Sequence, residues 1–216
     1  MNFDSARVQM VEQQVRAWDV LDQKVLDTLT QVPREHFVPE AYRELAFADT
    51  AIDLGHGETM MTPQQEGRLL QALEPRKTDN VLEIGTGSGF LTACLARLAG
   101  RVRSMEIHED FCIRAREKLA ALEFDNVNID CADAMNLAQR NRYDAVAVTG
   151  SLPHLERRFQ DALKIGGRLF VIVGQAPVME ALLITRVTED EWLRQTLFET
   201  VVPALKNVPE ITHFEF

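Results

Sequence analysis

Cysteine is scarce in this sequence, with three residues in a chain of 216, and no two of them stand in C-x-x-C spacing. We therefore expect Cys94, Cys112 and Cys131 to be reduced thiols, in a protein without a structural zinc. We expect Cys131 to be a small buried residue. The five histidines contain no H-x-x-x-H pair, so no metal site is predicted.

Long apolar runs and clusters of basic residues are also missing. No apolar segment is long enough to cross a bilayer, and the first residues lack the basic-then-apolar pattern of a signal peptide. We therefore expect a cytoplasmic protein that does not bind a membrane. The net charge of −10 disfavours nucleic acid as a partner, because neutralising phosphates needs clustered Lys and Arg.

What is present is the composition of an ordinary globular protein, with 46% hydrophobic and 26% charged residues. A chain of this length forms one domain, or one domain with appendages, and can bury a substantial core.

The clearest signal in the chain lies between residues 81 and 90. The apolar run Val81–Ile84 ends in the glycine-rich turn GTGSG, and an apolar helix-like pattern follows from Leu91. Strand, tight turn and helix in this order are typical of the first βα unit of a nucleotide-binding sheet. Glycine is needed there because a ligand approaches the backbone where a Cβ would clash. The N–H groups that open the helix offer hydrogen bonds to that ligand.

The glycine spacing indicates which ligand is bound. Dinucleotide turns read G-x-G-x-x-G, whereas this chain reads E-x-G-x-G-x-G from Glu83 to Gly89, with Phe90 at the place of the third dinucleotide glycine. This form resembles motif I of the S-adenosylmethionine-dependent methyltransferases, whose ligand has no pyrophosphate. An acidic residue near the end of the next strand is expected to hold the ribose hydroxyls. Glu106 follows Gly89 by 17 residues and fits that role.

We therefore predict S-adenosyl-L-methionine as the cofactor. Asp133 and Ala134, which follow the third strand, are the expected adenine edge, although an ordinary loop is the alternative there. For Glu106, the alternative is a solvated carboxylate at a strand end. The predicted cofactor-binding residues are Glu83, Gly85, Thr86, Gly87, Gly89, Glu106, Ile107, Asp133, Ala134 and Thr149.

Strand and helix patterns alternate after the glycine turn, which indicates a mostly parallel, doubly wound sheet. We expect an α/β fold of the Rossmann-like methyltransferase class, with seven strands and an antiparallel hairpin at the C-terminal edge. The expected strands lie at 81–84, 101–106, 126–129, 143–149 and 168–173, with helices at 108–122 and 155–163 and the hairpin at 179–187 and 191–200.

The first 75 residues are expected to form a lid of helices and loops packed on a core at 76–216. Helical spacing predicts a helix at 4–17 capped by Asp4 or Ser5, and another at 21–29 capped by Asp19. Residues 45–54 are expected to be irregular and 55–57 to form a loop. Thr62-Pro63 is a helix-start signal.

The chain also resembles a particular family, the protein-L-isoaspartate O-methyltransferases. The resemblance lies in the order and spacing of VPREHFVP, FADTAIDLGHGETMMTP, VLEIGTGSGFLTACLA, YDAVAVTG and LKIGGRLFVIVG. It implies methyl transfer from S-adenosylmethionine to the free carboxylate of isoaspartyl residues, a repair reaction on damaged proteins. It also implies that the last two strands are exchanged relative to the common methyltransferase sheet order.

The departure from this family lies in the loop expected to touch the substrate. Members usually read T-I-S-Q-P, and the serine is the family's proposed active-site residue. This chain reads T-M-M-T-P, so Met61 stands at the serine position and Thr62 at the glutamine position. The candidate catalytic residues are Thr62, Thr59 and Met61. The alternative roles are an N-cap for Thr62 and packing for Met61.

Three functions stay open at this stage. The first is an active isoaspartyl methyltransferase with an altered loop. The second is an enzyme of the same fold with another carboxylate or a small molecule as acceptor. The third is a cofactor-binding module with little catalysis.

Overall fold

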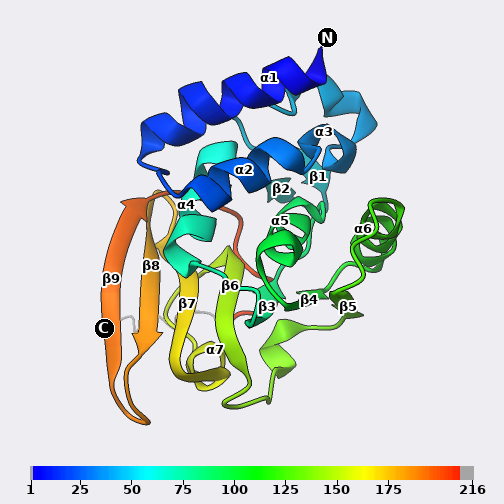
Figure 1. The fold of residues 1–216 in the computed structure, drawn as a ribbon. Coiled ribbons are helices and arrows are strands. Elements are labelled where there is room, and N and C mark those ends of the chain that lie inside the picture. Colours follow the sequence, from blue (N-terminus) through cyan, green and yellow to red (C-terminus); the bar gives the residue numbers. More distant parts are fainter. Residues whose placement is uncertain (1, 210–216) are drawn as a thin grey trace.

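The computed structural model describes residues 2–209 and has one seven-stranded sheet in the order β5-β4-β3-β6-β7-β8-β9 (Figure 1). The first five of these strands are parallel, and β8 and β9 are antiparallel to their neighbours. The strands are β3 (Asn80–Ile84), β4 (Arg101–Glu106), β5 (Val127–Cys131), β6 (Tyr143–Leu152), β7 (Leu163–Gln175), β8 (Val178–Arg186) and β9 (Trp192–Glu199). The predicted fold class and the edge hairpin are confirmed. Because β8 lies next to β7, the final strands have the exchanged order that the resemblance implied.

Alternate residues of the buried strands contribute to two hydrophobic cores, one on each face of the sheet. Ala145 and Ala147 face a core shared with α2, α4 and α5, whereas Val146 and Val148 face a core closed by α7. Period-two alternation of this kind follows from the pleat of a strand. The helices from residue 63 onward are α4 (Pro63–Leu73), α5 (Phe90–Leu98), α6 (Glu109–Ala121), α7 (Arg157–Asp161) and the 3₁₀ turn η4 (Ala134–Asn136).

The N-terminal segment is helical, as expected, and Figure 1 shows its first helices lying over α4 and α5. Its elements are α1 (Phe3–Met10), a π-helical turn η1 (Val11–Val15), η2 (Arg16–Trp18), α2 (Gln23–Gln31), α3 (Arg34–Phe37) and η3 (Glu40–Leu45). The predicted caps are wrong. Asn2 caps α1 by accepting from the N–H of Ser5, and Asp22 caps α2 by accepting from that of Lys24. Asp19 instead ends η2 in a left-handed conformation.

Residues 45–54 are less irregular than predicted, because they lead into a short hairpin. Strand β1 (Ile52–Gly55) pairs antiparallel with β2 (Glu58–Met60). The turn falls at 56–57, inside the predicted loop. Two strands of three or four residues flanked by glycines carry too little alternation to be read from sequence.

The expectation of three reduced cysteines is wrong for two of them. Cys112 on α6 and Cys131 at the end of β5 form a disulfide, with Cα atoms 6.1 Å apart, and Cys94 is a buried free thiol. Cys131 is also exposed and not buried. In the described part of the chain, no helix is both long and apolar enough to cross a membrane.

Candidate functional site

A pocket opens at the carboxyl ends of β3, β4 and β6, where ligands bind in doubly wound sheets. The open space among its lining residues is about 890 Å³, counting its opening to solvent. The β1–β2 hairpin and the segment 203–206 complete its walls. The predicted site residues that line it are Thr59, Met61, Gly85, Thr86, Gly87, Glu106, Ile107, Asp133, Ala134 and Thr149.

All three glycines of the turn have backbones that other residues rarely adopt, and Gly85 and Gly87 also line the pocket. Gly85 has a φ of +93°, and a Cβ there would collide with Oγ1 of Thr149. That hydroxyl donates to the carbonyl oxygens of Ile84 (2.9 Å) and Gly85 (3.0 Å) and so is fixed in place. Gly87 has a φ of +51°, and its Cβ would lie 3.2 Å from Cδ1 of Leu54. The turn therefore leaves the pocket open because it lacks side chains.

Glu106 joins this turn to the end of β4. One carboxylate oxygen accepts from the N–H of Gly87 at 2.9 Å, and the other accepts from those of Ile107 (2.9 Å) and His108 (3.0 Å). The side chain is 5% exposed and lines the pocket. A carboxylate can accept about four hydrogen bonds, so Glu106 keeps capacity for a ribose hydroxyl while it holds the turn.

Two predicted cofactor residues lie outside the pocket lining. Glu83 is fully buried under the turn, where it accepts from the hydroxyls of Thr92 and Ser104, both at 2.5 Å. Burial raises the pKa of Glu83 to about 8, against the lowering effect of those two hydrogen bonds. Gly89 caps α5, and a Cβ there would lie 3.1 Å from that of Ala115 on α6. In this structure both residues support the turn from below.

The predicted adenine edge lies beside the C-terminal segment. Asp133 accepts from the N–H of Met135 at 2.8 Å and from the side-chain amide of Asn207 at 2.9 Å. Ser151 fixes the same segment, because its backbone and hydroxyl bind residues 202–205. The pocket residues Pro203, Leu205 and Lys206 were not predicted. The nearby sequence signal is Val201-Val202-Pro203, which resembles the terminal F-V-P-L segment of the protein-L-isoaspartate O-methyltransferases.

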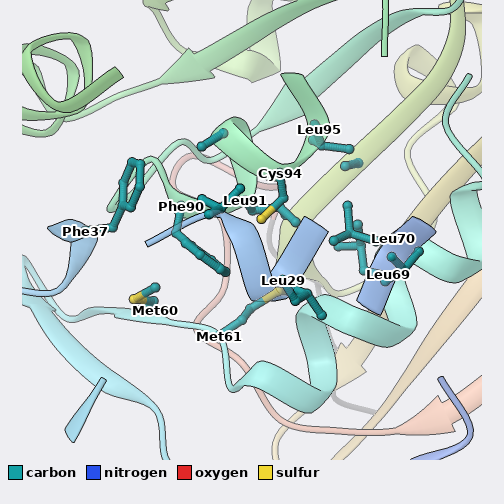
Figure 2. Close-up of a cluster of buried hydrophobic side chains, with 14 of the residues drawn as sticks. Leu29, Phe37, Met60, Met61, Leu69, Leu70, Phe90, Leu91, Cys94 and Leu95 are labelled. Carbon is teal, nitrogen blue, oxygen red and sulfur yellow. The ribbon is translucent and has the colours of Figure 1, made fainter. Parts of the chain in front are cut away.

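The three candidate catalytic residues of the loop at 59–63 lie in different surroundings. Thr59 and Met61 line the pocket, whereas Thr62 does not. Thr62 is the N-cap of α4 and forms a capping box with Gln65. Met61 is 8% exposed and belongs to a buried cluster that includes Leu29 and Phe90 (Figure 2). Thr59 is therefore the loop hydroxyl that lies in the pocket.

A buried ion pair below this loop was missed by the sequence analysis. Arg34 of the VPREHFVP segment is fully buried and pairs with Glu66 of α4. Its other N–H groups donate to the carbonyl oxygens of Met61 (2.7 Å) and Ala46 (2.8 Å), and its guanidinium lies 4.7 Å from the Phe90 ring centroid. Arg34 thus holds the backbone of the loop at 59–63 through a buried side chain.

Glu66 lines the pocket, and Arg34 is its side-chain partner among residues 2–209. Burial raises the pKa of Glu66 to about 7, while the charge and hydrogen bond of Arg34 lower it. No local pattern predicts this pair, since the two residues are 32 positions apart.

The mouth of the pocket is lined by charged and aromatic side chains. His56 of the hairpin stacks on His108 at 4.2 Å between ring centroids, and Phe111 packs edge-on against both. Lys206 pairs with Glu58 at 2.9 Å. These contacts connect the hairpin, the start of α6 and the C-terminal segment.

Solved structures with this fold include a Plasmodium falciparum protein assigned as a protein-L-isoaspartate O-methyltransferase, in complex with S-adenosyl-L-homocysteine. It matches with a TM-score of 0.79 at 22% identity and covers 93% of this chain and 98% of its own. A second structure, a protein-L-isoaspartate O-methyltransferase, matches with a TM-score of 0.80 at 22% identity over 92% of this chain and 65% of its own. These likenesses establish the fold.

Sequence relatives give the family. Protein-L-isoaspartate O-methyltransferase 1 of Rhodopseudomonas palustris (strain HaA2) is 38% identical over 88% of this chain and 78% of its own. The protein-L-isoaspartate O-methyltransferase of Geobacter metallireducens is 34% identical over 91% and 92%. Residues 5–207 match the family model of protein-L-isoaspartate(D-aspartate) O-methyltransferase. The chain therefore belongs to the protein-L-isoaspartate (D-aspartate) O-methyltransferase family.

Proposed function

We propose that this protein transfers a methyl group from S-adenosyl-L-methionine to the free carboxylate of isoaspartyl residues in damaged polypeptides. The observation that carries the proposal is the family match over 5–207 together with a pocket whose glycine turn and Glu106 fit the cofactor. Gly85 belongs to this turn, where a Cβ would collide with Oγ1 of Thr149.

The chemistry needs little acid–base help from the protein. S-adenosylmethionine supplies a methyl group on a positively charged sulfur. A carboxylate with a pKa near ~4 is already an ionised nucleophile at neutral pH. The pocket walls therefore have to orient the acceptor oxygen and exclude water, and positioning of this kind is worth on the order of 7–11 kcal/mol.

Within the pocket we assign the orienting hydroxyl to Thr59. Met61 cannot donate a hydrogen bond, and Thr62, the N-cap of α4, does not line the pocket. Thr59 lines the pocket on the strand that leads into this loop. Arg34, through the carbonyl of Met61, keeps the loop in the conformation that presents Thr59.

Product analysis tests this proposal. An isoaspartyl peptide incubated with the protein and S-adenosylmethionine should gain one methyl ester, on the free α-carboxylate of the isoaspartyl residue. The ester should then decay to a succinimide and to a mixture of aspartyl and isoaspartyl peptide. A methyl group found on another carboxylate, or on none, would reject the isoaspartyl acceptor.

The expected partners are isoaspartyl polypeptides, with the cytoplasm as the expected compartment. The net charge of −10 supports a partner other than nucleic acid.

A further inference from the structure

A second hollow adjoins the cofactor pocket on the far side of Leu54. It shares Leu54, Gly87, Ser88 and Phe111 with that pocket, so the two hollows lie on either side of these residues. Its own walls come from the VPREHFVP segment, from η3 and from the outer face of α6. We call it the basic basin, because its polar lining residues are His36, Glu40, Arg43, Arg114 and Lys118.

The charges of the basic basin are poorly neutralised by the protein itself. Arg43 and Lys118 have no carboxylate within salt-bridge distance in the described ranges. Arg114 pairs with Asp110 at 2.6 Å. Glu40 is the one carboxylate of the lining. The basin therefore keeps a net positive charge in a chain of net charge −10.

Lys118 shows how close these charges lie. Its ammonium group donates to the carbonyl of Phe37 at 2.7 Å, which leaves two of its three N–H donors unused by residues 2–209. Burial and, to a smaller extent, the charges of Arg114 and Arg43 together lower the pKa of Lys118 to about 8. An anion placed among the three cations would relieve this repulsion.

We propose that the basic basin binds carboxylate side chains of the acceptor polypeptide that flank the isoaspartyl residue. This inference rests on the proposed function, because a polypeptide whose isoaspartate lies by Thr59 can extend past Leu54 into the adjoining hollow. An extended polypeptide spans about 3.3 Å per residue. The side chains that flank the isoaspartyl residue therefore reach from one hollow to the other. Acidic stretches of a damaged protein are then preferred over neutral ones.

The test compares two isoaspartyl peptides of equal length, one flanked on both sides by glutamate and one by glutamine. We expect the wild-type protein to show a KM about two- to tenfold lower for the glutamate peptide, with similar kcat, on the scale of exposed ion pairs. This preference runs against the net charge of the protein, which alone would repel the acidic peptide. High salt should abolish the difference, because the screening length falls to about 3 Å at 1 M.

A matched pair of variants localises the effect. Arg43→Gln/Lys118→Gln removes two cations from the basin and should erase the preference. Arg101→Gln/Arg142→Gln removes two exposed arginines next to the amino ends of β4 and β6, at the opposite edge of the sheet, and should leave it unchanged. Equal KM values for both peptides in the wild type would overturn the inference, as would equal losses in both double variants.

A binding measurement separates this inference from the proposed function. Fluorescence anisotropy with the same two peptides, in the presence of S-adenosylhomocysteine, needs no turnover. If neither peptide is methylated, the acceptor assignment fails. The basin then still stands if the glutamate peptide binds more tightly to wild type than to Arg43→Gln/Lys118→Gln, and it fails if both proteins bind both peptides alike.

Discussion

Replacing Arg34 by methionine removes the positive half of the buried pair under the substrate loop. Methionine keeps an apolar stem of similar length, but the carboxylate of Glu66 then stays in the protein interior without its partner. Breaking a buried pair in this way costs about 3–5 kcal/mol. The carbonyls of Met61 and Ala46 also lose their donors. For a domain of this size, about 4 kcal/mol corresponds to a fall in Tm of roughly 8–16 °C.

The loss of unfolding free energy in Arg34→Met should depend on pH, because it depends on whether Glu66 is ionised. Its folded pKa of about 7 lies above the ordinary value of 4.5. The raised pKa therefore contributes stability that is fully present below about pH 4.5 and is lost as pH rises to about 7. Without Arg34 the pKa rises further, so the loss continues at higher pH. We expect Arg34→Met to cost more unfolding free energy at pH 8.5 than at pH 6.

Urea unfolding at these two pH values measures the difference. The control is Arg34→Met/Glu66→Gln, in which the buried carboxyl is gone and the extra cost at high pH should disappear. An Arg34→Met cost below about 1 kcal/mol, or an equal cost at pH 6 and 8.5, would refute the reasoning. Because Arg34 also holds the Met61 carbonyl, surviving folded protein should show a lower kcat with an isoaspartyl peptide.

Further predictions concern the cofactor and substrate sites. Glu106→Ala should weaken S-adenosylmethionine binding about ten- to a hundredfold, since hydrogen bonds to a charged group are worth roughly 1.5–3 kcal/mol. A change of less than twofold in calorimetry would show that Glu106 does not contribute to cofactor binding. Gly87→Val should abolish cofactor binding in a folded protein, because valine tolerates neither the positive φ nor the contact with Leu54. Calorimetry measures the binding and circular dichroism checks the fold. Unaltered affinity would show that the cofactor does not bind at this turn. Thr59→Val should lower kcat/KM on an isoaspartyl peptide, whereas Met61→Ser should raise kcat/KM and lower Tm, because it removes a buried side chain; equal activity of both variants and wild type would show that the loop does not carry recognition. Glu83→Gln should be nearly neutral at pH 4 and should make the protein more stable than wild type at pH 9, because the raised pKa of Glu83 lowers stability as pH rises from 4.5 to about 8; parallel pH profiles of unfolding would contradict this.

Much of the fold was predictable because its signals are local. Buried strands, the glycine turn and the spacing to Glu106 each lie within a short stretch of chain, and the sheet order follows from alternation and the family resemblance. The position of the pocket follows in turn, since parallel strands bring their carboxyl ends together.

The missed features depend on contacts between distant residues. Cys112 and Cys131 meet because Glu106, which precedes α6, pairs in register with Cys131 on β5. The Arg34–Glu66 pair forms only once α3 lies against α4. The role of Thr62 was ambiguous in sequence, because an N-cap and a substrate donor need the same hydroxyl.

The rate of methyl transfer to an isoaspartyl peptide, compared with its aspartyl isomer, tests the central claim most directly. With labelled S-adenosylmethionine at saturation, the two peptides differ only in which carboxylate is free. The proposed function predicts transfer to the isoaspartyl peptide and none above background to the isomer. Tight cofactor binding with equal or absent transfer to both peptides would contradict it.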